Sequence, residues 1–496
     1  MISFRRIISM GIVIASLFSC NDTTIDNIPE YSFLFTENPV MVGPNGGTIS
    51  TMVISDIEYT AEPLVEWISS VSIETGQTVS FHVTANTSES TRDGKIAFHI
   101  SGTDHVKELT VRQAASAKGL DVSENSLSFE AKGGNIDVTI TSQTSWDVLN
   151  APDWVVVSKK NSTAISVSAD VNYTGKSRSG EVVVGTAAES TKIIVNQQND
   201  NSLFSGATTE MGRRFVYNCS DLVNTVTTDK SYSLADGVDV LEIKYTSKIS
   251  GSVQPYYVYL FEINLNSNIG IVATSKNDDD NEIKRTDGEV TGVQTVRSQL
   301  KSLQKSRGIS VLGGINGDFF FGEGSSSSTY NNSLLHGVMY KRGICLKDSF
   351  EGGSACTVFA IMKDGTARIM TQSAYSSKKE DIMEAIGGRQ EVLSSGSITS
   401  VKNNKYDPRT AIGVSADRKK VIMAVVDGRR SSHSNGADYP ELGKILKAMG
   451  AYNGINLDGG GSSTFVVKES SGLTVRNKPS NDVERAVVNG LAIISK

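Results

Sequence analysis

Near its C-terminus the chain reads INLDGGGSSTF, residues 455–465. An apolar run ends there in the carboxylate of Asp458, and three glycines and two serine hydroxyls follow it. Glycine permits backbone dihedrals closed to other residues and lets the backbone approach a ligand closely. A strand that ends at Asp458, followed by a turn exposing amides and hydroxyls, would suit an anionic or sugar ligand. The alternative is a flexible Gly/Ser loop. Apolar residues flank the stretch closely on both sides, which argues against a flexible loop.

Length and composition predict a multidomain globular protein rich in strands. The chain has 496 residues, of which 38% are hydrophobic and 21% charged, and such a length suggests roughly three domains. Glycine is frequent (45 residues) and proline rare (9 residues), which favours strands and tight turns. The net charge of −6 provides no basic surface, so nucleic acid is not an expected partner.

The N-terminal segment resembles the signal of a bacterial lipoprotein. Two arginines precede the apolar run Ile7–Phe18, which is too short for a stable membrane helix. We expect residues 1–19 to be removed, Cys20 to be acylated and residues 20–30 to form a tether. The protein would then be an outer-membrane lipoprotein on the cell surface or the periplasmic face. The alternative is an ordinary secretory signal followed by an incidental cysteine.

The later cysteines, Cys219, Cys345 and Cys356, are odd in number, so at least one is expected outside any intrachain disulfide. A bridge between Cys345 and Cys356 is possible, because a turn-like segment separates them. No pair of cysteines or histidines has zinc-site spacing. Asp278–Asp280 lacks the alternation of a calcium loop, which predicts a solvated turn. We therefore expect neither a metal nor another cofactor.

The chain from Tyr31 to residue 198 contains two copies of one unit. The landmarks of the first copy recur in the second in the same order, which is hard to attribute to chance. Polar and apolar residues alternate in Ser80–Thr84 and in Ile136–Ile140, as they do in half-buried strands. The landmark pairs are Gly46-Gly47 with Gly133-Gly134, Trp67 with Trp154, Thr91–Gly94 with Ser177–Gly180, and Val111–Gln113 with Val195–Gln197.

Short strands separated by turns predict an immunoglobulin-like β-sandwich for each copy, over residues 31–116 and 117–198. The copies resemble BACON domains in their double glycine, their tryptophan segment and their closing Val-x-Gln. Trp67 and Trp154 lie beside apolar runs, so we expect them to be core anchors and not platforms for sugar rings. Neither copy has a further aromatic cluster, so we expect the sandwiches to be spacers.

A third domain is predicted over residues 205–496, after a polar linker at Asn199–Glu210. It is long enough to bury a core of its own. Strands outnumber helices in it, which predicts a mixed α+β domain. The predicted strands are Val238–Thr246, Tyr256–Asn264 and Ile269–Thr274, and the predicted helices are Gln294–Ser306, Asp381–Leu393 and Tyr439–Met449.

Four segments of the third domain place a carboxylate or arginine and a glycine beside an apolar run. Carboxylates bind sugar hydroxyls and act as nucleophile, base or acid at an anomeric carbon, and arginine binds phosphate in a bidentate manner. Carboxylates and arginines together suggest a substrate in which a sugar is joined to a phosphate. Each segment alone is also compatible with an ordinary turn around an inert core. The segments are Asn316–Phe320, Arg409–Gly413, Asp427–Arg429 with Ser434 and Gly436, and residues 455–465, and Glu484–Gly490 is a fifth.

These segments, in this order, resemble motifs of the phosphodiester glycosidase family. The resemblance covers most of the third domain and none of the chain before it. It implies hydrolysis of a sugar-1-phosphodiester, with release of the sugar from a phosphate that stays on the other partner. Gly387–Arg389 departs from the family pattern, in which a proline commonly follows the glycines, and we expect this departure to alter one wall of the pocket.

The resemblance and the residue chemistry together suggest roles. Asp318, Asp427 and Asp458 would supply the catalytic carboxylates, with Asp458 the first choice for an essential residue. Arg409 would hold the phosphate, and Arg485 is a second candidate for this role. His433 is a candidate acid or base, but a loop histidine without a role is the simpler interpretation. The predicted substrate-binding residues are Asn316, Arg485, Ser462, Ser463, Gly460 and Asn489.

Two other functions stay open from the sequence. One is a glycan-binding lipoprotein of the cell envelope whose site no longer catalyses a reaction, and the other is a structural envelope protein. The full set of carboxylates and arginines favours the enzyme. The expected partners are a glycan or sugar-phosphate substrate and, through the lipid anchor, the membrane.

Overall fold

The computed structural model describes most of the chain from Tyr31 to Lys496. The predicted signal peptide, Cys20 and the rest of the tether lie outside the described residues. The chain forms two compact units, one holding the first repeat with Ile140–Asp147 and Gly185–Thr191, and the other holding the remainder. The described ranges are 31–74, 77–116, 119–247, 253–283, 289–290, 292–322, 333–351, 353–401 and 405–496.

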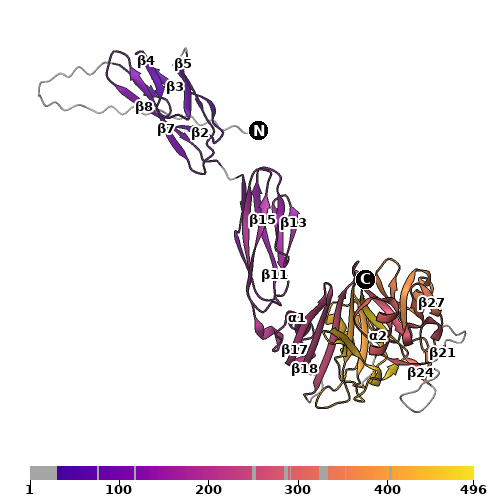
Figure 1. Cartoon of the computed structure of the whole chain (residues 1–496). Helices are drawn as coiled ribbons and strands as arrows, with labels where there is room; N and C mark the ends of the chain where they lie inside the picture. Colours follow the sequence, from indigo (N-terminus) through magenta and orange to yellow (C-terminus); the bar gives the residue numbers. More distant parts are fainter. Residues whose placement is uncertain are drawn as a thin grey trace, which may run out of the picture. The chain divides into compact units, whose positions relative to one another are not determined.

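The first repeat has two four-stranded sheets (Figure 1). Along β6, Val79, Phe81 and Val83 are buried while His82 is exposed, as expected for a strand with one face in the core. Residues of both sheets share one hydrophobic core, so the predicted β-sandwich is present. The sheets are β1 (Phe33–Phe35), β3 (Gly47–Ser55), β6 (Thr78–Val83) and β5 (Ile68–Glu74), and β2 (Val40–Val42), β8 (Val106–Gln113), β7 (Arg92–Ile100) and β4 (Tyr59–Pro63).

The second repeat has the same two kinds of sheet. Its strand β10 pairs in parallel with β16, just as β2 pairs in parallel with β8 in the first repeat. The repeated sequence landmarks therefore correspond to a repeated topology. The sheets are β10 (Ser126–Phe129), β16 (Ser190–Gln197), β15 (Arg178–Gly185) and β12 (Asp147–Asn150), and β13 (Val155–Asn161), β14 (Ala164–Ala169), β11 (Gly134–Ser142) and β9 (Leu120–Val122).

A tryptophan, an arginine and a glutamine form the same cluster in each repeat. Trp67 is half-buried against the core, and Arg92 Cζ lies 4.4 Å from its ring centroid. Arg92 Nε donates to Gln113 Oε1 over 2.9 Å, and the buried Gln113 amide donates to backbone carbonyls. The tryptophan therefore closes the edge of the core under a cation–π contact and does not fill the centre of the core. The counterparts are Trp154, Arg178 and Gln197.

Strands dominate the third domain, and three of its sheets share one hydrophobic core. The rings of Phe261 and Phe465, from two of these sheets, stack with their centroids 4.0 Å apart. The largest sheet is β17 (Val223–Ala235), β18 (Val238–Ser247), β19 (Pro255–Asn264), β34 (Lys420–Val426), β33 (Arg409–Val414), β35 (Asn453–Leu457), β31 (Glu391–Ser394) and β32 (Ser397–Ile398). The other two are β20 (Ile269–Ser275), β39 (Asn489–Ser495), β23 (Ser310–Asn316), β36 (Phe465–Glu469) and β37 (Gly472–Val475), and β27 (Ile344–Lys347), β26 (Met339–Lys341), β30 (Ile382–Gly388), β28 (Thr357–Met362) and β29 (Ala367–Thr371).

Two of the three predicted helices are confirmed. Helix α2 (Val296–Arg307) begins after Thr295, whose side chain caps it, and ends at Gly308 in a left-handed conformation. Helix α4 (Tyr439–Ala448) begins with a capping box formed by Asp438 and Glu441. Two further helices are α1 (Glu210–Asn218), which starts at the end of the predicted linker, and α3 (Gln372–Ser376).

The prediction of a helix at Asp381–Leu393 is wrong, because this segment forms β30 and β31. The two glycines at 387 and 388 weaken a helix, and pairing with β28 and β26 satisfies the backbone of the segment instead. The chain as described is mostly β, so helices contribute less to the third domain than the predicted mixed α+β class implies.

Two other predictions are corrected by side-chain contacts. Asp278 is not solvated, because it is buried and pairs with Arg307 at 2.7 Å and with Lys341 at 2.8 Å. Burial alone would raise its pKa, but these two partners lower the pKa to about 2. Cys345 and Cys356 are not joined in a disulfide.

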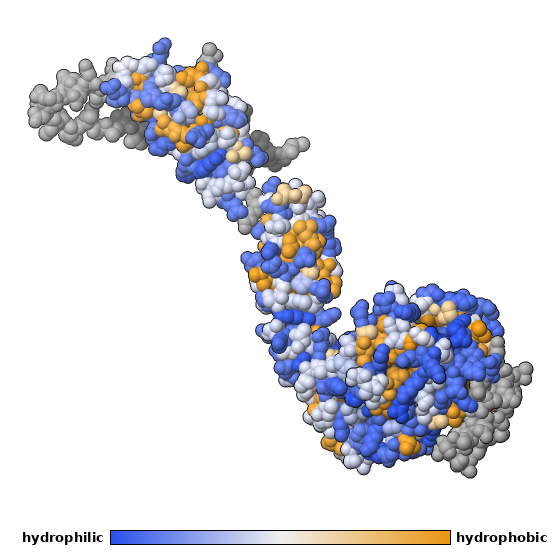
Figure 2. Space-filling view, in the orientation of Figure 1, coloured by the Kyte–Doolittle hydropathy of each residue, from blue (hydrophilic) through white to orange (hydrophobic). Residues whose placement is uncertain are grey.

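On the face shown in Figure 2, hydrophobic patches lie among hydrophilic residues. No helix among the described residues is long and apolar enough to cross a membrane.

Candidate active site

The triple-glycine stretch begins where β35 ends. Strand β35 is buried between β33 and β31, and it delivers Asp458 beyond its last residue. Asn316, the last residue of β23 in another sheet, donates through Nδ2 to the carbonyl oxygen of Asp458 over 2.6 Å. Its Oδ1 accepts from Thr410 Oγ1 over 2.8 Å and from the Thr464 N–H over 3.1 Å. Asn316 therefore holds both ends of the loop, so the loop is not a flexible linker.

The glycines allow two guanidinium groups to lie against this loop. Gly460 has a φ of 60°, a conformation that favours glycine. A Cβ at Gly461 would lie 2.3 Å from Arg485 Nη2, and a Cβ at Gly460 would lie 3.2 Å from Arg429 Nη2. Side chains at these positions would displace the arginines. The loop is therefore shaped to place positive charge beside Asp458.

The carboxyl group of Asp458 is desolvated and has a positively charged neighbour. Desolvation raises its pKa to about 6, although the hydroxyl of Ser462, the charge of Arg485 and the Gly459 N–H each favour the ionised form. Arg485 Nη1 also lies 3.5 Å from Ser462 Oγ. Two of the predicted substrate-binding residues, Ser462 and Arg485, thus lie at the predicted essential carboxylate.

Asp318 follows the end of β23 and is also buried. Its N–H donates to Asn489 Oδ1 over 2.8 Å, so the predicted binding residue Asn489 positions Asp318 through the backbone. Its Oδ2 accepts from the Gly337 N–H over 2.8 Å. Its Oδ1 is buried with no hydrogen-bond partner among the described residues. One carboxylate oxygen is therefore fixed, and the other is left for a ligand.

Asp318 and Asp458 interact electrostatically. Burial raises the pKa of Asp318 to about 7, and the charge of Asp458 adds to this effect. The N–H groups of Gly337 and Phe319 and the charge of Lys347 act in the opposite direction. Two neighbouring carboxyl groups whose pKa values are raised towards neutral pH are typical of sites for acid–base chemistry.

Two glycines make room for the Asp318 carboxylate. A Cβ at Gly387 would lie 2.3 Å from Asp318 Oδ2, and a Cβ at Gly337 would lie 3.1 Å from the same atom. Gly387 belongs to the segment that departs from the family pattern. The structure therefore places that segment in contact with a predicted catalytic carboxylate.

Sequence reasoning missed His336 and Arg389, which lie near Asp318. The His336 ring lies 4.0 Å from the ring of Phe321 and 5.9 Å from the ring of Phe319, between centroids. Burial and the charge of Arg389 lower the His336 pKa to about 4, so this histidine is neutral at neutral pH. Arg389 Cζ lies 5.5 Å from the Phe319 centroid. Arg389 belongs to the Gly387–Arg389 segment that departs from the family pattern, but the sequence assigns no role to it. His336 carries no signal in the sequence, because only folding brings it near Asp318.

Arg409 is placed differently from its predicted role. Its Nε donates to the carbonyl of Ala437 over 3.0 Å, and its Nη2 donates to the carbonyl of Lys405 over 2.8 Å. Its guanidinium also lies 4.8 Å from the ring centroid of Tyr439. Two of its five N–H donors are therefore used by backbone carbonyls. Arg429, on the neighbouring strand connection, has a side chain 49% exposed and is better placed to meet an anion.

Asp427 is buried and has several donors around it. It accepts from His433 Nε2 over 2.8 Å, from Asn477 Nδ2 over 3.1 Å and from the Lys478 N–H over 2.9 Å. Asn477 Nδ2 also donates to the carbonyl of Ser463 over 3.0 Å. These contacts favour a bracing role for Asp427 behind the glycine loop. They give His433 a partner, whereas Ser463 Oγ is buried with no partner among the described residues.

The predicted site residues thus separate into two groups. Asp318 and Asp458 lie near each other, with Ser462 and Arg485 beside Asp458. Asp427 is linked to the glycine loop through Asn477. The Arg409 side chain instead contacts Ala437, Lys405 and Tyr439. Within the described part of the chain, no group of histidine, cysteine and carboxylate side chains is arranged to hold a metal ion. The protein is thus modular, with two β-sandwich repeats and a mainly β domain in which two carboxyl groups lie near an arginine, a combination of groups that glycoside hydrolysis can use.

The family models agree with this class. Residues 310–494 match the model described as "Phosphodiester glycosidase". Residues 57–114 and 144–198 match the BACON model, described as "Putative binding domain, N-terminal". The chain therefore carries a phosphodiester glycosidase domain preceded by two BACON domains.

Individual relatives are distant. The chain is 30% identical over 187 residues to the SPbeta prophage-derived uncharacterized protein YomE of Bacillus subtilis. The match covers 34% of this chain and 27% of that protein. The chain thus spans about a quarter of the length of this relative. The catalytic domain of zebrafish N-acetylglucosamine-1-phosphodiester alpha-N-acetylglucosaminidase, auto-inhibited by its pro-peptide, is 19% identical over 54% of this chain and 89% of that one, with a TM-score of 0.40. A hypothetical protein from Synechocystis is 12% identical over 93% of this chain and 92% of that one, with a TM-score of 0.35.

Proposed function

We propose that the third domain hydrolyses a sugar-1-phosphodiester, releasing the sugar and leaving the phosphate on the other product. The observation that carries this proposal is the pair formed by Asp318 and Asp458, two desolvated carboxyl groups with raised pKa values beside the guanidinium of Arg485. A glycosidase needs two such carboxyl groups at the anomeric carbon. The match of residues 310–494 to the phosphodiester glycosidase model supports the same reaction.

The chemistry divides between the two carboxyl groups. Asp458 has the lower pKa and three groups that favour its charge, so it is the ionised partner that attacks the anomeric carbon or takes a proton from the attacking water. Asp318 keeps its proton to higher pH and is the candidate acid. The bond between the anomeric carbon and oxygen breaks, and its electron pair goes to the phosphate oxygen. Water supplies the hydroxyl of the sugar and the proton of the phosphate.

The phosphate needs charge stabilisation more than it needs a strong acid, because it is already a good leaving group. Arg485 and Arg429 lie against the glycine loop that carries Asp458. A guanidinium pairs well with phosphate oxygens and keeps its charge at any working pH. We therefore assign phosphate binding to these two arginines in place of Arg409, which is buried and donates to two backbone carbonyls.

The place of action is also part of the proposal. The lipoprotein-like signal ending at Cys20 supports attachment to the bacterial cell envelope, where glycans with phosphodiester links would be the substrates. A Cys20→Ser variant expressed in a bacterial host should no longer incorporate labelled fatty acid and should leave the membrane fraction. Unchanged labelling would reject the anchor without affecting the proposed reaction.

The reaction itself is tested by release of sugar from a panel of sugar-1-phosphodiesters. The wild-type chain should release free sugar from at least one member, and Asp458→Asn should reduce kcat/KM by roughly 10²-fold or more, as expected on removing a catalytic acid or base. A thermal melt must show that the variant still folds. Wild-type protein that binds glycans but releases no sugar would support the non-catalytic alternative and reject the enzyme.

A further inference from the structure

A pocket of about 280 Å³ lies where the largest sheet of the third domain ends, on the side away from Asp458. Strands β33 and β35 reach it with Val414 and Asn453, which pair with each other. Asp458 lies five residues beyond Asn453, at the other end of β35, which is roughly 16 Å at the usual strand rise. The pocket is therefore separate from the proposed active site. Its volume is near the lower end of the range of small-ligand pockets.

Three cationic side chains, and no carboxylate of the described residues, line this basic pocket. They are Arg368 on β29, Lys378 after α3, and Arg418 in the turn between β33 and β34. None of them makes a side-chain hydrogen bond or ion pair with another described residue, and Arg368 Nε is buried without a partner. The whole chain has a net charge of −6, so this cluster is a local feature. Gathered positive charges without counter-charges attract an anion.

The carboxylates close to the basic pocket have other partners. Asp364 accepts from the N–H of Thr366 over 2.9 Å and from its hydroxyl over 2.7 Å. These hydrogen bonds lower the pKa of Asp364 more than the charges of the two arginines do. Asp417 accepts from the hydroxyl of Ser415. Neither carboxylate lines the pocket, so the guanidinium groups are left for a ligand.

Arg418 has a backbone conformation that disfavours an arginine. Its φ is 66°, in the left-handed region where glycine and asparagine are preferred. Its carbonyl accepts from the Ala367 N–H over 2.9 Å, which fixes the turn beside β29 and therefore close to Arg368. Unfavourable backbone conformations are concentrated at functional sites. The charge that Arg418 contributes to the basic pocket gives a physical reason for an arginine at this position.

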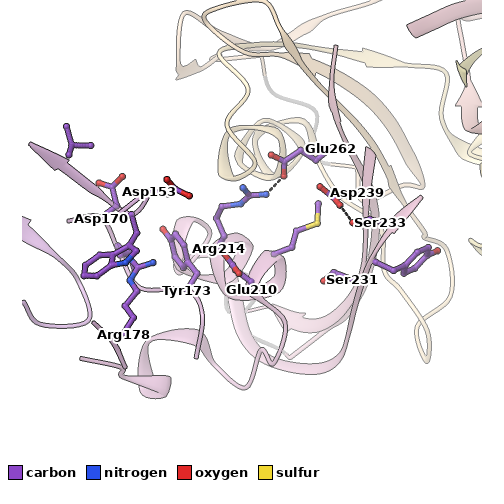
Figure 3. A pocket seen from close by; sticks show the side chains of 15 residues that line it. Asp153, Asp170, Tyr173, Arg178, Glu210, Arg214, Ser231, Ser233, Asp239 and Glu262 are labelled. Atoms are coloured by element: carbon purple, nitrogen blue, oxygen red, sulfur yellow. Dashed lines mark hydrogen bonds and ion pairs between the residues drawn. The ribbon is translucent and has the colours of Figure 1, made fainter. Parts of the chain in front are cut away.

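A larger cavity, of about 640 Å³, differs in its charges. Figure 3 shows it between side chains of the second repeat, such as Asp170 and Arg178, and side chains of the third domain, such as Glu262. Both signs of charge line this cavity, and Arg214 is paired with Glu262 across it. The charges of the larger cavity therefore offset one another, whereas those of the basic pocket do not.

We infer that the basic pocket is a second anion site, which takes a phosphate group. Guanidinium groups bind phosphate oxygens through parallel N–H donors, and a lysine ammonium adds a point charge. Tyr452 also lines the pocket and is 40% exposed, so its ring offers a surface for the molecule that carries the phosphate. The site takes no part in bond cleavage, and the inference does not depend on the proposed reaction.

Chemical labelling of Lys378 tests the inference at the pocket itself, so phosphate bound at the proposed active site does not interfere. Lys378 is exposed, and the rate of its acetylation in the full chain can be measured by peptide mass spectrometry. The probes are inorganic phosphate, glycerol 3-phosphate and an oligomer of glycerol phosphate. At about 1–10 mM, at least one should slow labelling about threefold relative to chloride at equal ionic strength. Labelling of Lys301, an exposed lysine on α2, should not change.

The three probes distinguish the source of the phosphate. Stronger protection by the oligomer than by inorganic phosphate would identify a phosphate group within a larger molecule as the ligand. The reverse order would identify free phosphate. Both results support the site.

Arg418→Asn separates ligand binding from stability. Asparagine suits a left-handed backbone better than arginine, so the melting temperature should stay the same or rise. The phosphate concentration that gives half-protection of Lys378 should nevertheless rise roughly tenfold, because charge-assisted hydrogen bonds are lost. Lys305→Gln, which removes one exposed positive charge on α2, is the matched control and should leave protection unchanged.

Three outcomes would overturn the inference. The first is the absence of Lys378 protection by every phosphate probe. The second is equal protection by chloride, which would show ionic screening only. The third is undiminished protection in a folded Arg368→Gln and Arg418→Asn double variant. Sugar release by Arg418→Asn should stay at the wild-type rate, and an inactive wild type would reject the proposed function without changing the labelling result.

Discussion

Gly387 on β30 must lack a side chain if Asp318 is to keep its place. A Cβ at this position would lie 2.3 Å from Asp318 Oδ2 and 2.7 Å from the Cα of Gly337. The second contact is with backbone, which cannot move aside as a flexible side chain can. Gly387→Ala should therefore displace the Asp318 carboxylate and break the 2.8 Å hydrogen bond from the Gly337 N–H to its Oδ2.

The size of the effect follows from these distances. A carbon atom and an oxygen atom in contact need about 3.3 Å, so the carboxylate must move by about 1 Å. Misplacement of a catalytic group by that amount costs roughly 10²-fold in rate, which corresponds to about 2.7 kcal/mol of transition-state stabilisation. Overpacking should also cost about 1–3 kcal/mol of folding stability, visible as a melting temperature lower by several degrees.

The assay is sugar release by the wild type, Gly387→Ala and a control. Gly270→Ala is the control, because a Cβ there would meet only the flexible end of Lys496 and one methylene group of Ile494. It should keep wild-type kcat/KM. A folded Gly387→Ala with wild-type kcat/KM would refute the role given to Asp318. An inactive wild type would instead reject the proposed function and leave the steric argument to be judged by the melting temperature.

Three further predictions concern charge. If Asp458 acts in its ionised form and Asp318 in its protonated form, the pH profile of kcat/KM should be bell-shaped, with its maximum between about pH 6 and 7. Asp318→Asn should remove the alkaline limb of this profile. A flat profile in the wild type would contradict the prediction. Both pKa values are raised in the folded state, so the folded protein binds more protons than the unfolded chain. The free energy of unfolding should therefore fall as the pH rises from about 4 to 7. In thermal melts, the melting temperature of Asp318→Asn should fall less over this pH range than that of the wild type. Lys341 is fully buried and pairs with Asp278 at 2.8 Å. Lys341→Met should therefore cost about 3–5 kcal/mol of folding stability, because it leaves a buried carboxylate without this partner. A loss below about 1 kcal/mol, measured by denaturant unfolding, would contradict this and would show that Arg307 alone is a sufficient partner for Asp278.

Much of the local structure could be predicted because it depends on neighbours in the chain. The polar–apolar alternation of Ser80–Thr84 predicts a strand with one buried face, and β6 has one. Leu442, Ile445 and Leu446 share one face at helical spacing, and α4 buries them. Asp381–Leu393 shows where this reasoning ends, because pairing with β28 outweighs the helical preference of a short segment.

The candidate site could be predicted only in part. Asp318, Asp458 and Arg485 carry motif signals that the resemblance recognises, and the structure places them together. Arg409 carries an equally clear signal, but its use by the carbonyls of Ala437 and Lys405 depends on a loop that only folding brings near. Gly387 was visible only as a departure from a pattern, and its contact with Asp318 could not be inferred.

The sequence by itself determined the repeated sandwich units, most strands and two helices of the third domain, and the strand-to-glycine turn at Asp458. These features arise from periodicity and from backbone preferences within a few residues. Only the tertiary structure decided which carboxylates adjoin, which arginines keep donors for a ligand, and where the second repeat and the third domain enclose a cavity. The physical reason is that desolvation and pairing of charges depend on atoms from segments far apart in the chain, and no local pattern records which of these segments meet.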